Sequence, residues 1–186
     1  MKIKVGVSNH HVHVTREALD ALFGEGYELH NKRNLVQLGQ FAAEETVDVE
    51  YNGKKLEHVR IIGPIRKYTQ VELLERDNEF LGCNAPVRTS GDLDECPDMK
   101  LIGPKGEYLA KSSGIVSNRH IHMSAYDLVL FNQDNKNIVT IKCDNGVVMD
   151  NVHIKSDETC ALEYHMNKDE AEELGIETGM EIEIIK

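Results

Sequence analysis

Two similar six-residue segments of the chain carry histidines with the spacing of metal ligands. Residues 8–13 read Ser-Asn-His-His-Val-His, and residues 117–122, 109 positions later, read Ser-Asn-Arg-His-Ile-His. In a β-strand, residues i and i+2 project to the same face, so each segment would present two imidazoles side by side. Such a pair can hold zinc or a similar borderline metal. In the alternative interpretation, two duplicated strands carry histidines that only form hydrogen bonds. The pairs are His11 with His13, and His120 with His122.

Each histidine pair needs a third partner, because a catalytic zinc usually has three protein ligands and one open position. An Asn-Gly pair follows each segment, and counting 19 residues on from its glycine, Gly53 or Gly146, reaches Glu72 or His165. The alternative for Glu72 is a solvated carboxylate at a helix start, and the alternative for His165 is a neighbour of a helix expected at 168–174. The predicted ligand groups are His11, His13 and Glu72 in the first half, and His120, His122 and His165 in the second.

Three arginines could bind an anionic substrate. Arg66 follows a Gly63-Pro64 turn six residues before Glu72, and a planar guanidinium can bind phosphate oxygens in a forked geometry. Arg88 lies in Pro-Val-Arg-Thr-Ser-Gly-Asp, and Arg119 lies inside the second histidine segment. The alternative for each is a surface ion pair with one of the 32 acidic residues.

The elements around the two segments repeat as well. Ile3, Val5 and Val7 alternate with polar or small residues, which predicts a strand before the first segment. Thr15 and Ser124 are typical N-caps of the short amphipathic helices that follow. Asp127 stands at the capping-box position of the second helix. The two Asn-Gly pairs, at 52–53 and 145–146, predict tight type I′ hairpins.

The first half is longer than the second between its helix and its hairpin. It carries 16 additional residues there, and they fall within Gly24 to Glu44. We expect a small hairpin in this insertion, formed by residues 27–29 and 35–38. Many short strands, glycine turns and few helices predict a mainly β chain of two small β-barrels with short capping helices. The fold is therefore expected to be pseudo-duplicated.

Composition excludes several function classes. The chain has 186 residues and a formal net charge of −11, which argues against a general nucleic-acid binder. No apolar run is long enough to span a membrane. The four cysteines form no C-x-x-C pair and are expected to be free thiols, several of them buried.

Taken together, five stretches resemble the zinc-dependent phosphotransacylases of the phosphate propanoyltransferase (PduL-type) family. They span residues 8–165 in order: Ser-Asn-His-His-Val-His, Ile-Gly-Pro-Ile-Arg-Lys-Tyr-Thr-Gln-Val-Glu, Ala-Pro-Val-Arg-Thr-Ser-Gly-Asp, Ser-Asn-Arg-His-Ile-His-Met and Leu-Glu-Tyr-His. One departure is His10, which stands where the family segment usually has Arg.

The resemblance implies a fold with strand exchange and a reaction. Residues 1–9 would join residues 117–186 in the first barrel, residues 10–116 would form the second, and two zinc ions would bind between them. The family interconverts acyl-coenzyme A plus phosphate with acyl phosphate plus coenzyme A. In a working assignment, the zinc of His11, His13 and Glu72 takes the sulfur side. The zinc of His120, His122 and His165 then takes phosphate with Arg66, and transfer is direct.

Two other functions use the same ligands. One is a two-metal hydrolase of phosphate esters or thioesters, and the other is a metal-binding module without catalysis. A cytoplasmic location is expected, because family members in bacterial microcompartments carry an N-terminal amphipathic extension and the seven residues before Ser8 have a strand pattern. The insertion at Gly24 to Glu44 is a candidate contact surface of a homodimer.

Overall fold

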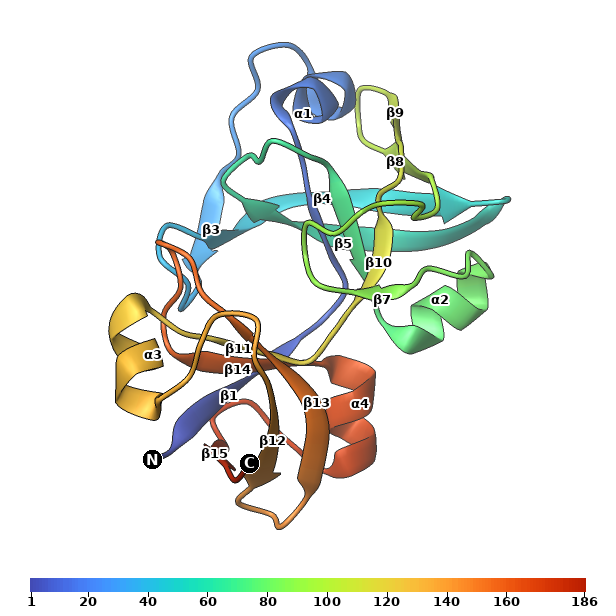
Figure 1. Cartoon of the computed structure of the whole chain (residues 1–186). Helices are drawn as coiled ribbons and strands as arrows, with labels where there is room; N and C mark the ends of the chain where they lie inside the picture. The colour runs from blue at the N-terminus through green and yellow to red at the C-terminus, as the bar shows by residue number, and fades with distance from the viewer. The chain divides into compact units, whose positions relative to one another are not determined.

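The computed structural model describes residues 1–186 and divides into two compact units. Unit 1 comprises residues 1–9, 36–38 and 118–186, and unit 2 comprises residues 10–35 and 39–117. The fold is mainly β with four short helices (Figure 1), as the sequence predicts. No helix combines the length and the apolar character that a bilayer crossing requires.

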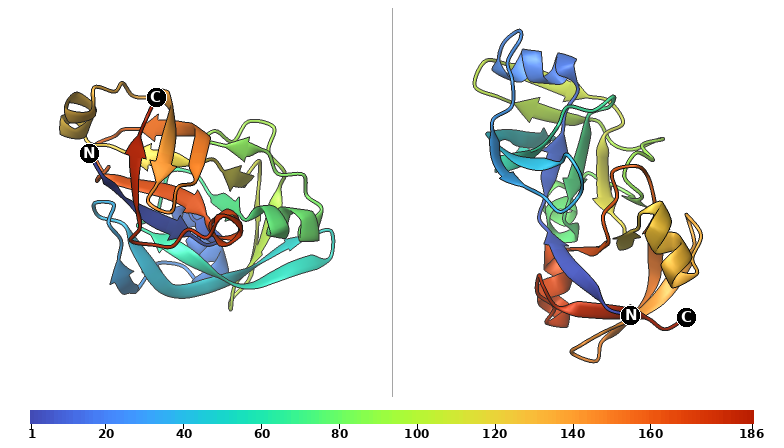
Figure 2. Two further views of the ribbon diagram at one scale, coloured as in Figure 1. Left: turned by 90° about the horizontal axis from the view of Figure 1, so that it is seen from below. Right: turned by 90° about the vertical axis from the view of Figure 1, so that its left-hand side faces the viewer.

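Unit 1 is a closed barrel of six strands. Strand β1 runs parallel to β14 and antiparallel to β15, so the N-terminal strand completes a barrel built by the C-terminal half. Figure 2 shows β1 in blue beside these red strands. This exchange is the one that the family resemblance implies. In barrel order the strands are β1 (Ile3–Ser8), β14 (Glu163–Asn167), β11 (His120–His122), β13 (Val148–Lys155), β12 (Ile138–Cys143) and β15 (Glu181–Ile184); the helices are α3 (Ala125–Phe131) and α4 (Lys168–Leu174).

Unit 2 is a nine-stranded sheet that curves into a half-barrel. Eight strands follow one path, and the ninth, β3 (Asn31–Asn34), pairs only with β4. Helices α1 (Arg16–Phe23) and α2 (Glu75–Leu81) complete the unit. The path is β7 (Val87–Arg88), β10 (Gly114–Ser117), β6 (Gln70–Leu73), β2 (His11–His13), β5 (Lys54–Gly63), β4 (Phe41–Tyr51), β8 (Met99–Ile102) and β9 (Glu107–Ala110).

Strand pairing confirms the duplication. In unit 2, β2 is parallel to β5 and antiparallel to β6, and in unit 1, β11 is parallel to β13 and antiparallel to β14. Each His-x-His strand precedes a helix, and the predicted caps are confirmed. Thr15 accepts from the backbone of Ala18, and Ser124 forms a capping box with Asp127.

Side chains alternate between the two faces of each His-x-His strand, and this places the histidines on the face away from the apolar core. Val12 and Ile121, the residues between the histidines, are fully buried, each in the apolar core of its own unit. Because neighbouring residues of a strand point to opposite faces, burial of the middle residue directs both histidines to the other face. All four cysteines are free and buried.

The insertion contains an antiparallel pairing, as predicted, but its strands are not at the predicted positions. The strand lies at residues 31–34, between the two predicted ones, and pairs antiparallel with β4. Residues 36–38 instead belong to unit 1, where the Leu38 amide donates to the Thr159 carbonyl at 2.9 Å. These contacts prevent the second predicted strand from pairing within the insertion.

Only one of the two type I′ turns is confirmed. Asn52 and Gly53 both have positive φ, at 48° and 79°, as a type I′ turn requires. Around Gly146 the hairpin is present but its turn is wider, since the Gly146 amide donates to the Cys143 carbonyl. The Asn145 side chain there donates to the carbonyls of Leu174 and Gly175 at 3.1 Å each, so its amide serves the end of α4.

The barrel core generates a stability prediction. Ile121 is 0% exposed, so Ile121→Ala should lower the free energy of unfolding by about 2–5 kcal/mol. Val129 on α3 is 82% exposed, and Val129→Ala should change it by less than about 0.5 kcal/mol. Urea denaturation followed by circular dichroism measures both; equal effects would contradict the assignment of Ile121 to the core.

Candidate metal centres

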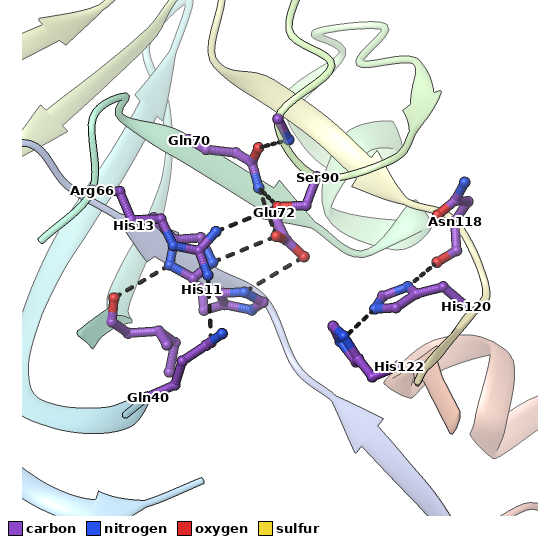
Figure 3. A network of polar contacts seen from close by, with 12 residues as sticks. His11, His13, Gln40, Arg66, Gln70, Glu72, Ser90, Asn118, His120 and His122 are labelled. Carbon is purple, nitrogen blue, oxygen red and sulfur yellow. Dashed lines mark hydrogen bonds and ion pairs between the residues drawn. The ribbon is translucent and has the colours of Figure 1, made fainter. Parts of the chain in front are cut away.

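The first predicted ligand group assembles in unit 2. His11 and Glu72 are direct partners across β2 and β6, and His13 lies two residues along the same face. The Nε2 atoms of His11 and His13 each lie 3.5 Å from a carboxylate oxygen of Glu72. Figure 3 shows the three side chains pointing toward one another. Glu72 lies within strand β6 and is 8% exposed, so the alternative of a solvated helix-start carboxylate is wrong.

Charge in this group is suited to metal binding. Burial, together with the nearby Arg66 and His11, lowers the pKa of His13 to about 4, although Glu72 opposes the shift. Burial alone would raise the pKa of Glu72, but His11 and His13 outweigh it and hold this pKa well below its usual range. A neutral imidazole and an ionised carboxylate are the forms that coordinate a metal.

The second predicted group assembles in unit 1. His120 faces His165 across β11 and β14, and His122 follows two residues along. The Nε2 atoms of His120 and His122 lie 3.1 Å apart. The Nδ1 atom of His120 lies 2.8 Å from the Asn118 carbonyl, drawn in Figure 3. His165 lies within strand β14, before α4 begins.

Both groups fit a zinc ion. In each, the three candidate ligand atoms lie within 4.8 Å of one another. Nitrogen ligands of one tetrahedral zinc are about 3.3 Å apart, given Zn–N bonds of about 2.0–2.1 Å. The 3.1 Å between the two Nε2 atoms in unit 1 is close to this separation. Sets of three histidines, or two histidines and one carboxylate, are also those of catalytic zinc sites.

Arg66 lies beside the group of unit 2. Its amide donates to the Val14 carbonyl at 2.8 Å, which fixes the backbone next to β2. Its guanidinium donates to Ser90 Oγ at 3.5 Å and to Gln40 Oε1 at 3.4 Å (Figure 3). Both contacts are long and to neutral atoms, so the guanidinium can still bind an anion. The preceding turn needs its glycine, since a Cβ at Gly63 would lie 2.3 Å from the Phe41 ring.

The other two predicted arginines have carboxylate partners. Arg88 Nε lies 3.9 Å from Asp92, at an exposed position. Arg119 forms an ion pair with Glu170 and donates to the Asp150 carbonyl at 2.9 Å. A surface ion pair is the alternative expected from the sequence for each of them. A role in substrate binding for either arginine stays a prediction.

His10 occupies a position equivalent to that of Arg119. Its Nδ1 lies 2.7 Å from Asp77, the third residue of α2, just as Arg119 pairs with Glu170, the third residue of α4. The substitution of His for Arg in the first segment therefore keeps a contact between a cationic or donor side chain and a helix-start carboxylate. His10 is turned to Asp77 and is not part of the ligand group.

Sequence reasoning missed the polar residues around the ligands. Gln40 and Ser90 flank Arg66, Gln70 contacts Glu72, and Glu163 contacts His165. Gln70 and Glu163 each stand two residues before a predicted third ligand. Strand periodicity alone could have placed both on the ligand face.

Comparison with known proteins agrees with this geometry. Residues 4–177 match the family model described as phosphate propanoyltransferase. The phosphate propanoyltransferase of Thermotoga maritima is 43% identical over 187 residues, covering 99% of this chain and 89% of that protein. Those of Rhodopseudomonas palustris and Salmonella typhimurium are 39% and 37% identical, covering 100% and 93% of this chain and 83% of each relative. The chain therefore belongs to the phosphate propanoyltransferase family and is a phosphate acyltransferase.

Proposed function

We propose that this enzyme interconverts a short-chain acyl-coenzyme A plus phosphate with acyl phosphate plus free coenzyme A, with two zinc ions per chain. The observation that carries the proposal is the pair of three-ligand groups in matching strand register. His11, His13 and Glu72 would hold one ion, and His120, His122 and His165 the other. Zinc would supply Lewis-acid stabilisation of phosphate oxygens and of the departing thiolate.

Arg66 is the proposed phosphate-binding residue. A phosphate oxygen attacks the thioester carbonyl carbon, the carbon–sulfur bond breaks, and coenzyme A leaves as its thiolate. Phosphate is a poor nucleophile until it is oriented, and a forked guanidinium contact orients it. Because Arg66 lies beside His13, phosphate bound to it would lie next to the group of unit 2. This revises the working assignment of phosphate to the zinc of His120, His122 and His165.

Direct transfer, without an acyl-cysteine intermediate, agrees with the burial of the cysteines. All four are buried, and burial raises the pKa of the thiols of Cys83, Cys96 and Cys160. Cys160 Sγ lies 3.3 Å from His122 Nδ1, but its raised pKa keeps it a thiol. A covalent acyl-enzyme on cysteine would need a reactive thiolate, and burial disfavours the thiolate at these three cysteines.

Phosphate dependence tests the proposed reaction. Release of coenzyme A from acetyl- or propionyl-coenzyme A should require phosphate and should yield acyl phosphate, because phosphate itself is the acyl acceptor. A thiol-reactive chromophore and a hydroxamate assay measure the two products. Release without phosphate would indicate the alternative hydrolase, since a hydrolase uses water. Bound metal without turnover would indicate a metal-binding module, and ping-pong kinetics would contradict direct transfer.

Metal stoichiometry tests the ligand groups. The purified enzyme should contain two zinc ions per chain. His122→Ala should remove about one zinc ion and abolish turnover, because the two remaining imidazoles are fewer than the three protein ligands of a catalytic zinc site. The control is His58→Asn at an exposed histidine with φ 57°, a conformation that asparagine tolerates. Elemental analysis gives the ratio; two zinc ions in His122→Ala would refute the assignment of His122.

The phosphate dependence of Arg66 variants tests its role. Arg66→Ala should weaken phosphate use by about 2–5 kcal/mol, the cost of losing one partner of a desolvated charged contact. Arg66→Lys should restore activity only partly, because an ammonium lacks the planar fork. Arg33→Ala, on the exposed strand β3, is the matched control. Steady-state kinetics with phosphate and coenzyme A varied separately measures the effect. A change confined to coenzyme A would place Arg66 in the nucleotide site.

Three further expectations stay predictions. They are a cytoplasmic location, a homodimer, and the division into two domains at the boundaries expected from the sequence.

A further inference from the structure

The residue two positions before the third ligand contacts that ligand in both halves. Gln70 Nε2 donates to Glu72 Oε1 at 2.6 Å, and Glu163 Oε2 lies 2.6 Å from His165 Nε2. Each pair shares one face of its strand, β6 or β14. The same contact therefore occurs twice, with different chemistry.

Each contact is matched to the chemistry of its ligand. A carboxylate ligand such as Glu72 only accepts hydrogen bonds, and the Gln70 amide offers it a donor. An imidazole ligand such as His165 has one nitrogen for the metal and one for a second partner, and a carboxylate is the acceptor that commonly binds the second. Exchanging the two supporting residues would set one carboxylate against another at Glu72, and at His165 it would replace a charged acceptor with a weaker, neutral amide oxygen.

We propose that Gln70 and Glu163 are positioning residues that set the orientation of the third ligand in each metal group, an inference that rests on the proposed metal binding. Gln70 keeps the Glu72 carboxylate turned toward His11 and His13. Glu163 holds the proton of His165 on Nε2, which leaves Nδ1 as the nitrogen for the metal.

Gln70 is itself held in one orientation. The Gly91 amide, which can only donate, reaches Gln70 Oε1 at 2.8 Å, so Nε2 must be the atom that faces Glu72. Nε2 also donates to Ser90 Oγ at 2.9 Å, and the residue is 0% exposed (Figure 3). A buried amide with every partner assigned has no freedom to rotate.

Glu163 is supported by the insertion of the first half. Gln37 Oε1 accepts from the Ala161 amide at 2.9 Å, and its Nε2 donates to the Ala161 carbonyl at 3.0 Å and to Glu163 Oε2 at 3.4 Å. Gln37 is 3% exposed. The segment 36–38 of the insertion thus reaches the second metal group through Glu163.

Gly6 provides the space for this contact. It pairs with His165 across β1 and β14, and a Cβ at this position would lie 2.7 Å from Glu163 Oε1 and 3.1 Å from His165 Cδ2. An alanine would push the carboxylate away from the ring. The glycine in an otherwise apolar-alternating strand is therefore explained by the Glu163–His165 pair.

Zinc affinity in two single-site backgrounds tests the proposal without relying on activity. Glu72→Ala leaves the His120, His122 and His165 group, and His122→Ala leaves the other. Glu163→Gln and Gln70→Met are added to each background, and competition with a chromophoric chelator gives the zinc affinity. Glu158→Gln and Gln133→Met are the matched controls, since both residues lie outside the two groups. Urea denaturation records the stability of every variant.

Each variant should act on one site only. Glu163→Gln should lower affinity about 10- to 100-fold where the three-histidine group remains and leave the other background unchanged. Gln70→Met should show the reverse pattern. A variant that only lost stability would have a lower zinc affinity in both backgrounds. Gln37→Ala should produce a smaller loss confined to the three-histidine group, and it tests the same contact if Glu163→Gln does not fold.

Unchanged affinity, or an equal loss in both backgrounds, would overturn the proposal. This result is distinguishable from failure of the proposed function. A wild-type protein that binds two zinc ions and shows the site-specific losses, but releases no coenzyme A with phosphate, would sustain the positioning role and refute the reaction. An active enzyme with two zinc ions whose variants keep full zinc affinity would support the proposed reaction and refute the positioning role.

Discussion

The register between two antiparallel strands is the constraint on which both metal groups depend. His11 stands opposite Glu72, and His120 stands opposite His165. Because side chains alternate between faces with a period of two, a slip of one residue would turn the third ligand into the apolar core and bring an apolar residue to the ligand face. Val12 and Ile121 oppose such a slip, since each would have to leave a fully packed core. Packing on one face of the strand thus specifies the chemistry on the other.

Between the two halves of the duplication, certain side-chain contacts are kept although the residue types that form them differ. The third residue of each histidine segment contacts a carboxylate at the start of a helix. The contact is His10 with Asp77 in one half and Arg119 with Glu170 in the other. Gln70 supports a carboxylate where Glu163 supports an imidazole. In each case both partners differ together, so the hydrogen bond or ion pair is retained. A carboxylate in one group and an imidazole in the other also give the two groups different charge on an otherwise repeated frame.

Sequence patterns predicted the parts of the fold that depend on local periodicity. The helices after Thr15 and Ser124, the hairpin at Asn52 and the mainly β class all follow from short-range signals. The third ligands were found by counting along the repeat, and the structure brings them to their histidine pairs. The strand in the insertion was misplaced, because residues 36–38 are held by unit 1, more than 100 positions away in sequence. No local pattern carries such a contact.

The supporting residues were missed for a related reason. Gln37, Gln40 and Ser90 belong to segments without a regular period, and only tertiary contacts bring them to Glu163 and Arg66. Their burial nevertheless has a physical requirement behind it. An ionised Glu72 that is 8% exposed must be compensated by donors or by a cation, and a neutral His13 must find an acceptor for its remaining proton, here the Ile62 carbonyl. Once a carboxylate and two imidazoles are placed on a buried strand face, the surrounding chain has to supply such partners, and the family resemblance of the ligand segments alone does not reveal which residues do so.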